Sequence, residues 1–199
     1  MREDEKVIVG IDLAGVEKRP TGFCVLEGLK ANTCVLYTDM QIVEKTTSAS
    51  PKIVAIDAPL ALPKDRKSLD VRSNIHFRQC DVELMKMGIK FFPITLGPMR
   101  KLTARGIALR KSLENRGIEV IETYPGAAQD ILRIPRKQNG LAKLKMGLEE
   151  RGIKNLDDSM SGDELDAVTC ALVGKMYVEG KHIAIGNPEE ILMILPKPM

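Results

Sequence analysis

The sequence Lys6-Val-Ile-Val-Gly-Ile-Asp12 is a short apolar run that ends in an aspartate. A second run, Lys52-Ile-Val-Ala-Ile-Asp57, has the same form. Runs of this length and composition predict buried β-strands. A buried carboxylate without a partner costs several kcal/mol, so such groups are normally paired, protonated or bound to a cation. The two aspartates are therefore candidates for a site at the ends of two strands.

A third acidic motif lies in Ser161-Gly-Asp163-Glu164-Leu-Asp166. Ser161 and Glu164 form a capping-box pattern that predicts the start of a helix, and the helix dipole stabilises acidic residues in a first turn. Capping alone would explain Asp163 and Glu164. Asp166 follows on a largely apolar helix, on the same face as Asp163. Several acids with few bases among them favour a divalent metal site.

The chain has 199 residues, which suits a single domain over residues 1–199. Its four cysteines have no C-x-x-C spacing, so we expect reduced cysteines in a cytoplasmic protein. Only two histidines occur, which disfavours a Ser-His-Asp relay. The charged first residues and the short apolar run after them predict neither a signal peptide nor a membrane helix. Carboxylate chemistry is therefore the main candidate.

Basic residues concentrate between residues 60 and 118. This segment contains 13 Lys and Arg against 5 Asp and Glu, a net charge of +8 in a chain whose net charge is +3. We expect it to be a basic helical insertion within the domain. The charge is explained either by a solvated surface or by a polyanionic partner. In the second case the residues expected to contact phosphates are Arg78, Arg100, Lys101 and Arg105.

The hydrophobic pattern predicts the order of the elements. Strands at 6–12, 21–26 and 33–38 have short connections, which predicts an antiparallel meander. A helix near 40–47 would cross over to a parallel strand at 53–57, and a fifth strand is expected at 119–123. Further helices are expected near 69–87, 98–116, 125–132, 141–150 and from 161 onward. Residues 183–195 should form a closing hairpin.

This order matches the ribonuclease H-like architecture, a three-layer α/β fold. Its mixed five-stranded sheet has the order 3-2-1-4-5, with strand 2 antiparallel and helices on both faces. Five motifs resemble those of the domain-of-unknown-function 429 family: Gly10-Ile-Asp-Leu-Ala-Gly15, Ile56-Asp-Ala-Pro59, Arg78-x-Cys-Asp-x-Glu83, Glu122-Thr-Tyr-Pro125 and Gly162-Asp-Glu-Leu-Asp166. They span nearly the whole chain, and the resemblance implies a nuclease of this fold. The last motif also resembles the helix that supplies metal ligands in RuvC resolvases.

Two parallel strand ends and a helix would bring the acids together at the carboxyl edge of the sheet. We expect Asp12, Asp57 and Asp166 to be catalytic, and these three with Asp163 to hold two Mg²⁺ or Mn²⁺ ions about 3.5–4 Å apart. The expected function is hydrolysis of phosphodiester bonds in DNA or RNA.

Four further residues are candidates for contacts with the substrate or with the metal ligands: Arg78, Asp81, Glu122 and Glu164. A helix-surface ion pair at positions i and i+3 is the alternative for Arg78 and Asp81. A strand-end carboxylate in solvent is the alternative for Glu122.

Two other functions stay open. Gly10-Ile-Asp-Leu-Ala-Gly15 resembles the first phosphate loop of actin-like ATPases, although those proteins pair two such domains around the nucleotide. The second alternative is a non-catalytic nucleic-acid-binding or regulatory module that kept the acids. No membrane partner is expected, and the sequence leaves a homodimer open.

Overall fold

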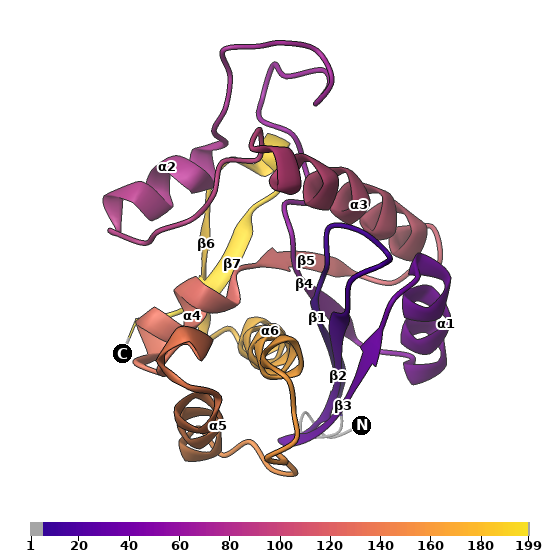
Figure 1. Ribbon diagram of the computed structural model, residues 1–199, viewed down its shortest axis with the longest axis vertical. Helices are drawn as coiled ribbons and strands as arrows, with labels where there is room; N and C mark the ends of the chain where they lie inside the picture. The colour runs from indigo at the N-terminus through magenta and orange to yellow at the C-terminus, as the bar shows by residue number, and fades with distance from the viewer. Residues whose placement is uncertain (1–5, 199) are drawn as a thin grey trace.

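The computed structural model describes residues 6–198, which form a seven-stranded mixed sheet flanked by helices (Figure 1). The charged residues 1–5, which contribute to the expectation of no signal peptide, lie outside the described part. In sheet order β3-β2-β1-β4-β5-β7-β6, the strands are Lys30–Leu36, Thr21–Glu27, Val7–Asp12, Ile53–Asp57, Val120–Thr123, Met193–Pro196 and His182–Ile185.

The first five strands have the predicted order and directions. β1, β2 and β3 form an antiparallel meander, while β1, β4 and β5 run parallel to one another. The parallel register pairs Asp12 with Asp57, so both aspartates end their strands at the same edge of the sheet. The expected ribonuclease H-like topology is confirmed in this part of the sheet.

The sheet is larger than the five strands that the sequence predicts. The closing hairpin forms as expected, from β6 and β7, but it does not stay separate from the sheet. β7 pairs in parallel with β5, Glu122 against Met193 and Thr123 against Ile194. The apolar residues of β7 are buried there, so the hairpin extends the sheet beyond β5.

Helices cover both faces of the sheet, as predicted. In chain order α1 to α6 are Asp39–Ala49, Gln79–Lys86, Gly97–Glu114, Pro125–Leu132, Leu141–Glu150 and Gly162–Val178. Figure 1 shows α6 and α1 on opposite sides of β1 and β2. Alternate residues of β1 enter the two cores. Ile8 belongs to a core cluster with residues of α4, α5 and α6, whereas Val9 and Ile11 belong to one with residues of α1 and α3. None of the helices within residues 6–198 combines the length and apolarity needed to cross a lipid bilayer.

The helix predicted near 69–87 is shorter than expected and begins only at Gln79. Arg66 explains the difference, because its buried guanidinium donates hydrogen bonds to the carbonyls of Ser68 (3.0 Å), Val71 (3.2 Å) and Ile75 (2.6 Å). Those carbonyls serve a folded loop instead of a helix. The loop lies between β4 and α2, at the top of Figure 1.

Arg105 was expected to contact phosphates, and this expectation is wrong. Its side chain is buried, and it donates hydrogen bonds to the carbonyls of Ala14 (2.7 Å) and Tyr37 (2.6 Å) and to the Asp39 carboxylate (2.7 Å). It therefore ties α3 to the loop after β1 and to the start of α1.

Two glycines allow α6 to approach the sheet closely. A Cβ atom on Gly10 would lie 2.1 Å from the carbonyl oxygen of Ala167, and one on Gly22 would lie 1.9 Å from that of Asp163. Both distances are far below van der Waals contact, so no larger residue fits without moving the helix. Since Gly22 pairs with Asp12 across the sheet, this approach places the start of α6 directly beside the end of β1.

We predict that Gly10→Ala destabilises the protein by about 3 kcal/mol, because the added methyl group overpacks the contact with the α6 backbone. The matched control is Gly97→Ala in α3, where a Cβ would meet nothing within 4 Å. Urea unfolding of the two variants beside the parent measures the difference. Equal midpoints for Gly10→Ala and Gly97→Ala would contradict the proposed constraint.

Candidate active site

Four aspartates meet at the carboxyl edge of the central strands. Asp12 and Asp57 end β1 and β4, and Asp163 and Asp166 lie in the first two turns of α6. The parallel register brings the first two together, and the close crossing at Gly22 brings α6 beside them. The structure thus gathers all four residues that the sequence predicts as metal ligands.

A lysine lies among these acids. The Lys137 ammonium is 2.8 Å from Asp166 Oδ2, 3.3 Å from Asp163 Oδ1 and 3.7 Å from Asp12 Oδ2. Lys137 begins a short 3₁₀ helix, Lys137–Asn139, between α4 and α5. Sequence reasoning missed it, because an isolated lysine in the polar stretch Arg136-Lys-Gln-Asn carries no pattern.

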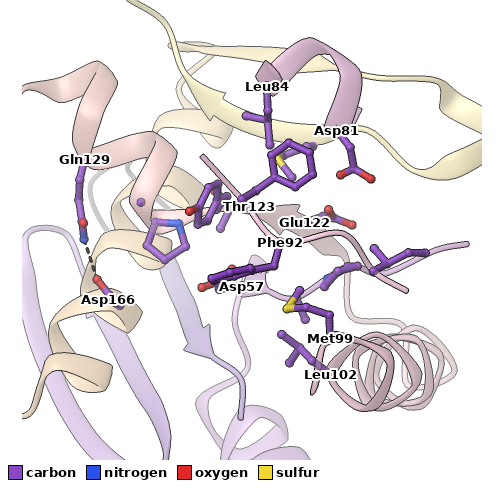
Figure 2. A pocket seen from close by; sticks show the side chains of 18 of the residues that line it. Asp57, Asp81, Leu84, Phe92, Met99, Leu102, Glu122, Thr123, Gln129 and Asp166 are labelled. Carbon is purple, nitrogen blue, oxygen red and sulfur yellow. Dashed lines mark hydrogen bonds between the residues drawn. The ribbon is translucent and has the colours of Figure 1, made fainter. Parts of the chain in front are cut away.

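Gln129 fixes the orientation of Asp166. Its side-chain amide donates a hydrogen bond to Asp166 Oδ1 at 2.7 Å (Figure 2). The amide also donates to the Thr169 hydroxyl at 3.1 Å, and all three residues are buried. Asp166 therefore has one carboxylate oxygen held by Gln129 and the other by Lys137. Gln129 was also missed, although its burial on α4 could have been anticipated from the helix pattern.

Burial and mutual repulsion shift the protonation of the acids. Burial first, and then the Asp166 charge, raise the pKa of Asp12 to about 7, although Lys137 acts in the opposite direction. Burial followed by the charges of Asp12 and Asp166 raises the pKa of Asp57 well above its usual range. For Lys137 burial opposes the charged form, but Asp166, Asp12 and Asp163 outweigh it and raise its pKa. The site holds more negative charge than one ammonium neutralises, which favours a further cation.

A buried charge network supports the neighbouring strand ends. The two terminal guanidinium nitrogens of Arg78, Nη1 and Nη2, donate to Glu122 at 2.6 and 2.7 Å, and Nη2 also reaches Asp81 at 3.3 Å. Glu122 Oε2 further accepts a hydrogen bond from the Leu60 backbone at 2.7 Å. The network therefore ties β5 and α2 to the loop that follows Asp57.

This burial corrects two sequence-based alternatives. Arg78, Asp81 and Glu122 are each at most 3% exposed, so the pair is not on the helix surface and Glu122 is not in solvent. The bonds of the Arg78 guanidinium to Glu122 and Asp81 also leave it unsuited to grip a phosphate. Through the bond from Leu60 to Glu122, the network also fixes the loop that follows Asp57.

Glu164 serves the helix cap instead of the site. Its carboxylate accepts hydrogen bonds from the backbone and hydroxyl of Ser161, each at 2.9 Å, and from the Thr33 hydroxyl at 2.9 Å. The capping box predicted from the sequence is thereby confirmed. Glu164 links the start of α6 to β3.

A cavity of about 260 Å³ opens beside Asp57 and Asp166. Figure 2 shows Phe92, Met99 and Leu102 among its lining residues, and Phe92 is 68% exposed. A second hollow reaches Asp12 and Asp163 and is lined by the exposed basic residues Arg19 and Lys101. The charged residues Arg78, Asp81 and Glu122 also line the cavity. The acids thus lie between a partly apolar cavity and a basic rim.

The sequence model of the family described as "Protein of unknown function (DUF429)" matches residues 10–191. The chain belongs to this family. It is also similar in structure to two solved structures of Thermus thermophilus RuvC, the first of them in complex with a Holliday junction substrate. The TM-scores are 0.53 and 0.49, each with 17% identity over 87% of this chain and 96% of that one. The first likeness shows a ribonuclease H-like fold, as expected. No curated protein matches the chain.

The acids fit a hard divalent cation in chemistry, because Mg²⁺ and Mn²⁺ prefer carboxylate oxygens. Their spacing fits the ammonium of Lys137 instead. Within residues 6–198, no three His, Cys, Asp or Glu side chains are grouped closely enough to hold a metal ion. Metal binding in this site would therefore require the acids to close in and Lys137 to move.

We predict that the metal-free protein loses stability as the pH rises, through Asp12. Its pKa in the folded state, about 7, lies above the ordinary value of 3.8. The folded state therefore holds the proton more tightly between these values, and the resulting stability is full at low pH and lost as the pH rises to about 7. Asp12→Asn should remove this loss, worth roughly 2–4 kcal/mol. Urea unfolding in EDTA at pH 5 and pH 8 measures it, and parallel pH dependences for parent and variant would refute it.

Proposed function

We propose that this protein is a metal-dependent nuclease that hydrolyses phosphodiester bonds of nucleic acid. The observation that carries the proposal is the meeting of four aspartates at one edge of the sheet, where their negative charge is only partly neutralised. Such a site favours divalent cations and gains little from monovalent ones. Phosphodiester hydrolysis is a reaction that carboxylate-held cations support.

Asp12, Asp57, Asp163 and Asp166 would hold the cations. Two Mg²⁺ or Mn²⁺ ions, when bound, supply an acidified water and neutralise charge on the phosphate. Gln129 keeps Asp166 oriented, and the network around Glu122 holds the loop that follows Asp57. Preorganisation of this kind lowers the cost of reaching the reactive geometry.

The surroundings of the acids support a nucleic-acid substrate. Arg19 and Lys101 line the hollow next to Asp12 and Asp163 and are free of the burial that rules out Arg105. Lysine and arginine at such a rim attract phosphates. The partly apolar cavity beside Asp57 offers room for the sugar or base next to the cleaved bond. The similar RuvC structure contains a Holliday junction, which agrees with this choice of partner.

A second candidate function is a non-catalytic nucleic-acid-binding or regulatory module. One observation favours it, since Lys137 satisfies three of the acids without any metal. In a protein that had lost catalysis, this lysine would keep the acid cluster neutral enough to fold. The two functions differ in whether any substrate is cut.

The cleavage test uses single-stranded, duplex and branched DNA and RNA with Mg²⁺ or Mn²⁺. We predict that the parent cuts at least one substrate and that Asp12→Asn or Asp166→Asn lowers the rate at least about a thousandfold. Asp158→Asn is the control, because this exposed carboxylate pairs with Lys145 on α5. Acid variants that cut as fast as the parent would refute the catalytic assignment. No cleavage by any protein, with binding retained, would favour the second candidate function.

The binding test compares the basic residues beside the acids with an exposed lysine far from them. In an Asp12→Asn background, Arg19→Gln and Lys101→Gln should each flatten the slope of log affinity against log salt by about 0.7–0.9. Lys181→Gln, an exposed lysine near the end of α6 away from the acids, should leave the slope unchanged. Fluorescence anisotropy with labelled oligonucleotides measures the slopes. Equal slopes for all three variants would argue against a basic rim that grips phosphates.

A further inference from the structure

We propose that Lys137 is a built-in cation that occupies the metal site of the metal-free protein and that a divalent metal must displace it. The inference rests on the proposed function and deepens it, because it states what sets the metal requirement of the site. Lys137 is in this view a specificity-determining residue that competes with the metal for the same oxygens.

The Lys137 ammonium lies within 3.7 Å of three carboxylates that come from β1 and α6, and a lysine ammonium carries three N–H donors. Mg²⁺ holds oxygen ligands at about 2.0–2.1 Å and demands near-octahedral geometry. An ion that drew Asp12, Asp163 and Asp166 to that distance would need the space where the ammonium lies.

The fold leaves space for the Lys137 side chain beside the start of α6. Gly162 is the first residue of α6, and a Cβ atom there would lie 3.1 Å from Lys137 Cδ and 3.3 Å from Leu141 Cδ2. Because Gly162 has no side chain, the aliphatic part of Lys137 can pass beside it to reach the acids. A surface lysine that extends into solvent would not need this space.

The neighbouring arginine shows that the segment is held in place. Arg136 donates to Asp130 Oδ1 at 2.8 Å, and its guanidinium lies 5.7 Å from the centre of the Tyr124 ring. Arg136 is thereby engaged on α4, while Lys137 extends to the acids. The Lys137 side chain remains 39% exposed, so it can leave the site without unfolding the protein.

Competition has a reciprocal consequence. If the ammonium and the metal exclude each other, the free energy that Lys137 gives to the metal-free protein is subtracted from metal binding. Removing the lysine should therefore lower the free energy of unfolding of the metal-free protein and raise its affinity for the metal. Removal of a surface lysine that contacts no site residue would change neither the stability nor the metal affinity.

The test is calorimetric titration of Mn²⁺ into the full chain, with no substrate present. We expect Lys137→Met to bind Mn²⁺ roughly tenfold more tightly than the parent, as loss of one nearby positive charge predicts. In EDTA the same variant should melt at a lower temperature, and saturating Mn²⁺ should raise its melting temperature by more than it raises that of the parent.

Two further variants sharpen the test. Lys145→Met is the matched control, because Lys145 also pairs with two acids, Asp158 and Glu149, and is remote from the site. It should bind Mn²⁺ like the parent. Gly162→Ala should crowd the Lys137 stem and shift the affinity in the same direction as Lys137→Met, by less. It also keeps the inference testable if Lys137→Met does not fold.

Each outcome decides something different. Equal or weaker Mn²⁺ binding by both Lys137→Met and Gly162→Ala would overturn the competition, while cleavage by the parent would leave the proposed function standing. Absence of Mn²⁺ binding in every protein would overturn both. Tighter binding without any cleavage would support the competition and count against catalysis.

Discussion

The close crossing of α6 over β1 and β2 is the constraint on which the rest of the structure depends. Gly10 and Gly22 leave no room for a side chain between the strands and the helix backbone. The helix therefore starts beside Asp12, and its own aspartates join the two that end the parallel strands. A wider spacing, as any side chain at Gly22 would impose, would separate Asp163 from Asp12 and dissolve the site.

The gathered carboxylates create a second constraint, which is electrostatic. Burial, and then mutual repulsion, raise the pKa values of Asp12 and Asp57. The folded protein therefore disfavours the charged forms of these two acids. Lys137 offsets part of this, and Gln129 fixes one acid. The buried Arg78 and Glu122 pair contributes rigidity more than net stability, because desolvation of such a pair cancels much of its attraction. Burying these carboxylates together costs free energy of folding, and perturbed pKa values of this kind cluster at functional sites.

Much of the fold could be predicted because local patterns determine it. Apolar runs, a capping box and short connections gave five strands, most helices and the four aspartates. Contacts between distant residues of ordinary type could not be read from the sequence. Lys137 meets Asp12 across 125 positions of chain, Arg66 captures loop carbonyls that a helix would have used, and β7 finds the free edge of β5. These are tertiary contacts between residues far apart in the sequence, and no periodic pattern in the sequence predicts them.

The central claim is that the aspartates form a metal site whose resident cation is Lys137. Anomalous diffraction from Mn²⁺-soaked crystals of the parent tests it most directly. The account predicts two manganese peaks among Asp12, Asp57, Asp163 and Asp166, with the Lys137 ammonium moved out of contact with Asp166. Crystals that show no manganese at these acids, with Lys137 still bound to Asp166, would contradict it.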